Sequence, residues 1–392
     1  MNPLPERVGY VVIGLGALGS AAAWQLARRG HRVVGFEQFA LGHDRGASHD
    51  TSRILRHSYH TPGYVELTKA AYQDWADLEA CAGEQFLTVT GGLDLFPDGG
   101  AIPADDYTES LTAAGIEFEM LTAEQIRQRW PQFRLGEDVV GLWQDRSAVV
   151  PAASGTAAMQ RLAREGGARL VDQCPVLEVR PVDSAYAVVS EQGTVLADRV
   201  VICADAWTNR LLDGLGAGIP LTTTLEQVTY FSPPEPGLFD PERFPLWIWM
   251  DEPCFYGFPC YGESTVKAAQ DCGGPVVDPN ARTSDPDPPM QDLLAEHLAR
   301  MLPEAGAPVR SLRCQYTLTP DRDFVVDQVP GHPGVVVGLG SAHGFKFAPT
   351  FGRLLADLAE HGACPDPRAD LTPFRFDRPG LTDPDYQPHW LV

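Results

Sequence analysis

The chain has 392 residues, more than one ordinary domain holds, so its length predicts two or three domains and excludes a small binding module. Hydrophobic residues make up 44% of the sequence and charged residues 21%, which indicates a globular protein rather than a disordered one. Acidic residues outnumber basic ones by 52 to 30, and the resulting formal charge of −22 repels phosphate backbones and anionic lipids. Neither nucleic acid nor a membrane is an expected partner.

The eight cysteines are spread along the chain without a CxxC pair. This usage is typical of a reducing compartment and gives no sign of a metal site. The first residues lack a basic start followed by an apolar stretch, and no run approaches the roughly 20 apolar residues of a membrane span. We therefore expect a cytoplasmic protein.

The N-terminal region has the pattern of a β-α-β unit. Residues 8–14 form a β-branched apolar run, residues 17–29 carry small and apolar residues at helical spacing, and residues 31–37 have the composition of a second strand. Further strands are expected within 168–180, 186–203 and 334–340, and further helices at 151–167 and 350–361. Strands and helices therefore alternate, which predicts an α/β fold.

Proline and glycine accumulate in two intervals, residues 86–145 and 220–310. We interpret these intervals as a second domain that is inserted twice into a nucleotide-binding domain. The predicted nucleotide-binding domain consists of residues 1–85, 146–219 and 311–392.

A dinucleotide fingerprint, GLGALG, lies between the first expected strand and the first expected helix. Gly14 permits the tight turn, Gly16 leaves room for the pyrophosphate, and Gly19 lets helix and strand approach. The helix N-terminus, at Ala17 and Leu18, offers amide donors to the phosphates. The position of the motif between a strand and a helix predicts dinucleotide binding, where glycines alone would not.

Glu37 ends the second expected strand, 18 residues after Gly19. A carboxylate at this position accepts hydrogen bonds from the ribose hydroxyls and repels a 2′-phosphate, so NADP is disfavoured relative to FAD or NAD. The fingerprint opens the chain, and the remaining strands follow after insertions. This order favours FAD.

Segments from nearly the whole chain carry a family resemblance. They are the fingerprint, HDTSRILRHSY (49–59), ADAWTNRLL (204–212), FYGFPCYGESTVK (255–267), RCQYTLTPDRDFVVD (313–327), SAHGFKF (341–347) and DLTPFRF (370–376). Together they resemble the monomeric sarcosine oxidase and N-methyltryptophan oxidase family of D-amino-acid-oxidase-like flavoproteins. The resemblance implies a Rossmann-type FAD-binding domain with an inserted antiparallel-sheet substrate domain, in a monomer or weak homo-oligomer. It also implies oxidation of a secondary or N-methyl amine by O₂ to an imine and hydrogen peroxide.

The resemblance implies that the flavin is attached covalently through a thioether to Cys314, with Arg313 as a neighbouring positive charge that favours the thiolate. A buried structural cysteine is the alternative reading of Cys314. The other residues that the resemblance places at the cofactor are Ser52, Arg53, Val176, Gly340, His343, Gly344 and Lys346.

For the substrate side, the resemblance places Arg56 and Lys346 at the substrate carboxylate, where a guanidinium binds two oxygens at once. It places Lys267 near flavin N5, where a fixed cation stabilises the negative charge of reduced oxygen. Tyr256 and Tyr316 would line the substrate cavity. Without the resemblance, the charged residues would be read as surface groups and the tyrosines as core residues.

The sequence departs from the family at Asp271, where a histidine is common four residues after the lysine. An acid there would either favour a more cationic amine or pair with Lys267 and slow the oxygen reaction. Trp247 and Trp249 share one face of an expected strand. They either shape a larger aromatic pocket or belong to the core of a sheet.

Three other functions remain open at this point. A flavin dehydrogenase would pass electrons to a protein or quinone instead of O₂. A biosynthetic or catabolic enzyme of the same type would dehydrogenate a cyclic imino acid or amine. A catalytically silent nucleotide-binding protein would bind FAD without reducing it.

Overall fold

The first sheet contains the β-α-β unit that the sequence predicts. In the computed structural model, which describes residues 3–366 and 369–387, β1 (Arg7–Ile13) pairs in parallel with β2 (Val33–Phe36), and α1 (Ala17–Arg28) connects them. The other strands of this sheet are β9 (Arg169–Val171), β10 (Val176–Val182), β11 (Ala185–Ser190), β12 (Gly193–Ile202), β18 (Val325–Val329) and β19 (His332–Leu339). Parallel pairing runs through β9, β2, β1, β12 and β19, which is the pattern of a Rossmann-type domain.

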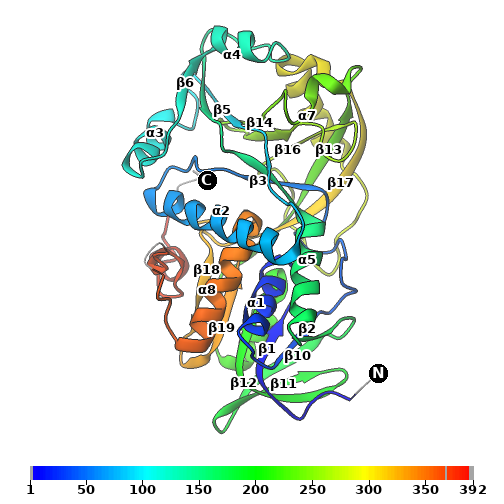
Figure 1. Cartoon of the computed structure of the whole chain (residues 1–392), viewed down its shortest axis with the longest axis vertical. Coiled ribbons are helices and arrows are strands. Elements are labelled where there is room, and N and C mark those ends of the chain that lie inside the picture. Colours follow the sequence, from blue (N-terminus) through cyan, green and yellow to red (C-terminus); the bar gives the residue numbers. More distant parts are fainter. Residues whose placement is uncertain (1–2, 367–368, 388–392) are drawn as a thin grey trace.

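Helices pack closely on this sheet because α1 is built from small residues. Ala21, Ala22 and Ala23 are fully buried, and α1 lies between α5 (Ala152–Glu165) and α8 (Ala348–His361) (Figure 1). A side chain at Gly352 of α8 would lie 2.4 Å from the Cβ of Ala21. The two helices therefore touch through glycine and alanine, which holds α1 and the fingerprint loop in a fixed position.

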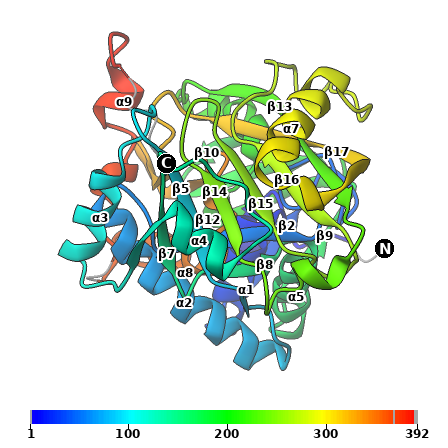
Figure 2. The same cartoon turned by 90° about the horizontal axis from the view of Figure 1, so that it is seen from above.

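The second sheet occupies the other end of the molecule (Figures 1 and 2). In spatial order its strands are β17 (Ala307–Leu318), β13 (Thr222–Ser232), β16 (Val266–Gln270), β15 (Phe255–Phe258), β14 (Leu246–Trp249), β5 (Gly92–Pro97), β7 (Val139–Gln144) and β6 (Glu119–Thr122). Every pair is antiparallel except β5 with β14. The sheet is therefore mixed. Its parallel pair joins β5, from the first inserted interval, to β14, from the second.

One predicted domain boundary is wrong. The sequence assigns residues 311–392 to the first domain, but β17 pairs along its whole length with β13 of the second sheet and ends at Leu318. Cys314 and Tyr316 consequently belong to the second sheet.

Shorter elements join the two sheets. β3 (Ser52–Leu55), β4 (Thr88–Val89) and β8 (Ala148–Pro151) form a small sheet, and α2 (Pro62–Ala82) lies between the two ends of the molecule (Figure 1). The remaining α-helices are α3 (Ala104–Ala113), α4 (Ala123–Arg129), α6 (Thr208–Leu212), α7 (Pro288–Met301) and α9 (Pro379–Thr382). In the part of the chain that the structure describes, no helix combines the length and apolar character needed to cross a membrane.

Strand register divides the second sheet into two faces. Tyr230 pairs with Lys267, Lys267 pairs with Phe258, and Glu226 pairs with Cys314, so these side chains share one face. Trp247 lies on the opposite face, packed across Gly257 and against α7. Trp249 faces the same way and contacts His297 of α7. The two tryptophans therefore belong to the core behind the sheet and do not shape a pocket on the Lys267 face.

Candidate cofactor-binding and active site

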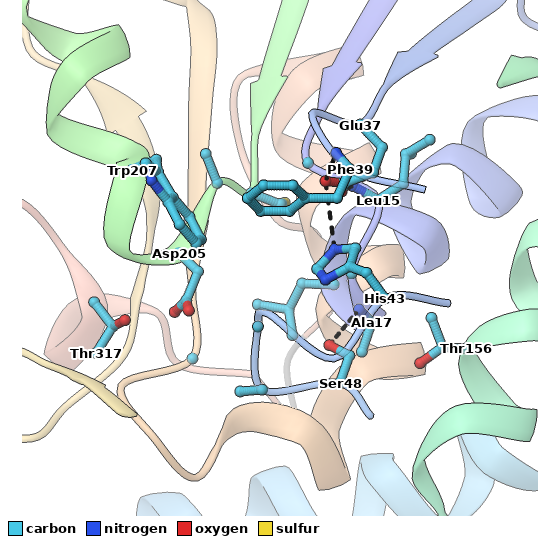
Figure 3. A pocket seen from close by; sticks show the side chains of 18 of the residues that line it. Leu15, Ala17, Glu37, Phe39, His43, Ser48, Thr156, Asp205, Trp207 and Thr317 are labelled. Carbon is cyan, nitrogen blue, oxygen red and sulfur yellow. Dashed lines mark hydrogen bonds and ion pairs between the residues drawn. The ribbon is translucent and has the colours of Figure 1, made fainter. Parts of the chain in front are cut away.

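A long cavity runs from the fingerprint loop to the second sheet (Figure 3). One end is lined by Gly14, Gly16 and Glu37 of the first domain, and the other by Cys314 and Tyr316 of β17. Of the other predicted residues, Ala17, Leu18, Arg53, Val176, Gly340 and Gly344 also line it. The sequence therefore identified residues of both ends, which lie about three hundred positions apart.

Glycine is required at the fingerprint for two reasons. Gly14 has a φ of +86°, and a Cβ there would lie 2.3 Å from the carbonyl oxygen of Cys203. A Cβ at Gly19 would lie 1.8 Å from the carbonyl oxygen of Gly14. Gly19 does not line the cavity. Its lack of a side chain instead lets α1 approach the turn.

Glu37 is buried beside the fingerprint loop (Figure 3). Its Oε2 accepts a hydrogen bond from the Leu15 amide at 2.8 Å, and its Oε1 accepts one from the Phe39 amide at 3.0 Å. The Nε2 atom of His43 lies 3.4 Å from Oε1. These contacts fix the carboxylate at the cavity wall, with further lone pairs for ribose hydroxyls.

Several residues of the nucleotide end were missed by the sequence reasoning. Phe39 and Trp207 meet edge to face at 5.5 Å between ring centroids, and Asp205 lies between Trp207 and Thr317 (Figure 3). Asp205 has a φ of +48° and accepts a hydrogen bond from Gln315 Nε2 at 3.1 Å. Burial raises the pKa of its carboxyl. The segment ADAWTNRLL was singled out only for its resemblance, and no local pattern showed which side chains face the cavity.

At the opposite end, Arg53 and Cys314 line the cavity from different elements. Arg53 donates to the carbonyl oxygens of Ser52 at 2.8 Å, Ala47 at 2.9 Å and His49 at 3.0 Å, and its guanidinium lies over the ring of Phe345. Burial raises the pKa of the Cys314 thiol, while the positive charges of Arg53 and Lys267 oppose that increase.

Arg313 does not face Cys314, contrary to the prediction. Successive residues of β17 point to opposite faces, so Arg313 donates to the Leu225 carbonyl oxygen at 2.8 Å and lies 3.4 Å from a carboxylate oxygen of Asp287. The cations that act on the Cys314 thiol are instead Arg53 and Lys267.

Lys267 is almost completely buried on β16. Its Nζ lies 2.5 Å from Oδ2 of Asp50, and it donates to the carbonyl oxygen of Ser52 at 3.0 Å and to the Ser52 hydroxyl at 3.2 Å. Ser52 thus contacts Lys267 and does not line the cavity. Burial and the charge of Arg53 lower the pKa of Lys267 to about 8, against the opposing effect of Asp50. No local pattern pointed to Asp50, because its partner, Lys267, is more than two hundred residues away along the chain.

Arg56 is also buried, and it forms an ion pair with a carboxylate that the sequence did not reveal. Its Nη1 donates to Oδ2 of Asp94 at 2.8 Å and to the Ser58 hydroxyl at 2.9 Å. Both side chains of the pair are less than 5% exposed. The charge of Arg56 is therefore balanced within the protein.

Lys346 has a different environment. It is partly buried, and its Nζ donates to the hydroxyl of Tyr59 at 2.6 Å, yet no carboxylate of the described chain forms an ion pair with it. Burial lowers its pKa to about 7, and the charges of Arg56 and Arg322 add to this effect. Of the cations predicted at the substrate side, Lys346 is thus the one whose charge is not paired within residues 3–366 and 369–387.

Asp271 pairs with Arg322 and not with Lys267. The distance from Arg322 Nη2 to Asp271 Oδ2 is 2.9 Å, and Asp50 occupies the position beside Lys267. Of the two consequences predicted for this residue, a direct pairing with Lys267 is therefore wrong. The Asp271 carboxylate interacts electrostatically with Lys346, Tyr256 and Tyr59, which places it near two of the residues predicted to contact the substrate, Lys346 and Tyr256.

The two predicted tyrosines are neighbours. Tyr256 of β15 and Tyr316 of β17 share a hydrogen bond, and burial raises the pKa of both phenols. His343 lies behind the cavity wall instead of lining it: its Nε2 is 3.0 Å from the carbonyl oxygen of Arg322, and its ring packs against Phe324. Burial lowers the pKa of His343 well below its ordinary value, so the imidazole is neutral.

The fold and the cavity together define a dinucleotide-binding protein, with the cavity reaching from the Rossmann-type sheet to the second sheet. The chain belongs to the FAD-dependent oxidoreductase family, because residues 10–358 match the family described as DAO, FAD dependent oxidoreductase. It is 35% identical to monomeric sarcosine oxidase of Streptomyces avermitilis over 377 residues, which cover 93% of this chain and 97% of that protein. It is 28% identical to N-methyl-L-tryptophan oxidase of Salmonella arizonae, over 95% of this chain and 99% of that protein.

A solved structure shows the same architecture. NikD, described as an unusual amino acid oxidase essential for nikkomycin biosynthesis, aligns with a TM-score of 0.83 at 27% identity over 95% of this chain and 98% of that chain. The predicted family resemblance and fold class are thereby confirmed. The described residues fit FAD, because the glycine turn and Glu37 form one end of the cavity and a thiol with a nearby guanidinium forms the other.

Proposed function

We propose that the protein oxidises a secondary or N-methyl amine of amino-acid type to an imine and passes the electrons to O₂, which yields hydrogen peroxide. The observation that carries this proposal is that two lysines lie next to residues of the second-sheet end of the cavity. Lys267 interacts electrostatically with Arg53 and Cys314, which line it, and Lys346 directly follows Phe345, which also lines it. When bound, FAD supplies the acceptor for two electrons and the hydrogen from the carbon next to nitrogen.

In this proposal, the side chains bind the substrate, exclude water and stabilise negative charge on reduced oxygen. Lys346, whose charge has no internal counterion in the described chain, binds the substrate carboxylate, and Arg56 adds a guanidinium that Asp94 partly neutralises. Tyr256 and Tyr316 line the substrate side and exclude water from it. Lys267 places a positive charge where reduced oxygen accumulates negative charge.

Cys314 holds the cofactor covalently in this proposal. Its thiol lines the cavity, and Arg53 and Lys267 stabilise the thiolate that the attachment requires. Acid precipitation tests the bond: the yellow colour should remain in the protein pellet, and C314S should release it. Cys174 lines the same cavity, so C174S is the matched control and should keep the colour in the pellet. Release of the cofactor from the unmodified protein would contradict the attachment.

A screen that records peroxide tests the reaction itself. The substrates are N-methyl amino acids, cyclic imino acids and bulky aromatic amines, each added to air-saturated holoenzyme. Peroxide formed in proportion to amine consumed supports the oxidase. A dehydrogenase of a cyclic imino acid or amine is the alternative, and the ion pair between Lys267 and Asp50 favours it because it reduces the net positive charge near the ring. In that case an artificial dye, and not O₂, would accept the electrons.

The eight cysteines form no disulfide with one another. We propose that the enzyme acts in the cytoplasm, as a monomer or weak homo-oligomer.

A further inference from the structure

We propose that Asp50 fixes Lys267 as an ammonium ion and orients it behind Arg53 and Cys314, which line the second-sheet end of the cavity. The inference rests on the proposed function in one respect: if O₂ is the electron acceptor, Asp50 sets the pH range in which the reduced enzyme reacts with it.

The hydrogen bonds of Lys267 support a charged side chain. Lys267 Nζ donates to the Ser52 carbonyl oxygen at 3.0 Å and to the Ser52 hydroxyl at 3.2 Å, and it forms an ion pair with Oδ2 of Asp50 at 2.5 Å. A neutral amine would accept from the Ser52 hydroxyl instead, but it would lose the attraction of the Asp50 carboxylate. The ion pair therefore favours the ammonium form, which acts on the nearby cavity through its charge.

Asp50 is itself held in place by contacts from another strand. Its Oδ1 accepts a hydrogen bond from the Tyr230 hydroxyl at 2.5 Å, and that hydroxyl also lies 3.0 Å from Thr51 Oγ1. Arg310 stacks on the outer side of the Tyr230 ring at 3.7 Å. Tyr230 and Lys267 are register partners on β13 and β16, so the sheet aligns the lysine with the tyrosine that positions its counterion.

The backbone of Asp50 lies in the left-handed region. Its φ is +75°, a conformation that glycine adopts freely and that aspartate tolerates better than most other side chains. Glycine would therefore suit this turn, but only a residue with a carboxylate supplies the ion pair with Lys267.

The charged and titratable groups that face Lys267 come from three elements. Asp50 and Arg53 lie in and before β3, Tyr230 is on β13, and Cys314 is on β17; His49 precedes Asp50. Burial lowers the pKa of His49 to about 4, so it is neutral near pH 8, and Arg53 repels the ammonium. Burial opposes ionisation of Asp50, but the Lys267 charge and the hydrogen bonds lower its pKa to about 2. Asp50 is thus the negative charge that stabilises Lys267.

The experiment is a pH titration of the visible absorption of the oxidised holoenzyme, which senses a charge beside the ring without turnover. The wild-type protein should show a transition near pH 8 that is absent from K267M. Without Asp50 the ammonium loses its counterion, so the midpoint should fall by about one pH unit or more, a change of roughly tenfold or more in proton affinity.

Two variants make the test robust. D50N keeps the size of the side chain, and D50G suits the positive φ, so at least one of them should fold with the native backbone. Asp183 is the matched control, because it is an exposed aspartate with a φ of +50° in the turn between β10 and β11. D183G should leave the midpoint unchanged. An unchanged midpoint in both Asp50 variants would overturn the proposal, even if their melting temperatures fall.

Stopped-flow reoxidation of the reduced enzyme by O₂ separates this proposal from the proposed function. If the oxidase function holds, the rate should follow the same midpoints as the absorption. If the wild-type enzyme reacts with O₂ no faster than K267M at any pH, the proposed electron acceptor is wrong. The absorption midpoints would still show whether Asp50 keeps Lys267 charged.

Discussion

The two ends of the cofactor cavity are built in different ways. At the nucleotide end, the contacts come mainly from the main chain of one short stretch, residues 13–39, and from Glu37, which two backbone amides hold. At the second-sheet end, they come from Arg53 of β3, from side chains of β17 and from the segment 340–345, with Lys267 of β16 behind them as a nearby charge. The first end depends on the absence of side chains, and the second on their charges.

The comparison also explains how each end responds to mutation. At Gly14 and Gly19 an added Cβ would meet main-chain oxygens that cannot move aside, so the turn does not tolerate a side chain at these positions. A cluster of buried charges fails when one partner is removed, because the other remains buried without compensation. The predictions below follow this distinction.

The largest effect is expected at the nucleotide end. In G19A the new Cβ would lie 1.8 Å from the Gly14 carbonyl oxygen, so α1 must move away from the turn. We expect the flavin content per chain to fall to about a tenth or less, since displacement of a binding group by about 1 Å has effects of this size. The ratio of visible to protein absorbance measures it. G63A is the control, because a Cβ at Gly63 meets open space. Equal flavin content in G19A and G63A would contradict the expectation that the nucleotide end does not tolerate an added side chain.

A smaller effect is expected at the second-sheet end from K346M. The variant removes the cation that has no ion-pair partner in the described chain but leaves the backbone unchanged. The dissociation constant of a simple carboxylate inhibitor should rise by about 10- to 100-fold, the value of a charged hydrogen bond. Perturbation of the flavin spectrum measures this binding. K69M removes a partly exposed lysine that pairs with Glu66, and it should bind the inhibitor normally. Equal affinities in K346M and K69M would assign the carboxylate to another residue.

The smallest effect is a pH dependence of the same binding. Burial lowers the pKa of Lys346 to about 7, so the ammonium is present below that pH and is lost above it. Inhibitor affinity should therefore fall by up to about tenfold for each pH unit above 7, until other groups titrate. K346R should flatten the profile, because arginine stays charged throughout this range. A wild-type profile as flat as that of K346R would show that Lys346 is not the group that binds the anion.

The nucleotide end was the easier part to predict from the sequence. The fingerprint, the β-α-β unit and Glu37 lie within thirty residues, so local patterns were sufficient to place them. The second sheet was harder, because β17 pairs with β13 across some eighty intervening residues. For that reason the boundary at residue 311 was wrong. Arg313 was predicted as the positive charge beside Cys314, but the cations that act on this thiol, Arg53 and Lys267, come from other strands.

The amino-acid sequence by itself determined the dinucleotide-binding unit and the family, since both follow from short motifs whose geometry is local. Only the tertiary structure decided which charges meet. Asp50 with Lys267, Asp94 with Arg56, and Asp271 with Arg322 are all pairs between distant segments. The physical reason is that the free energy of a buried charge depends on the groups within a few ångströms of it. Strand register and domain packing determine which groups these are, and spacing along the chain does not.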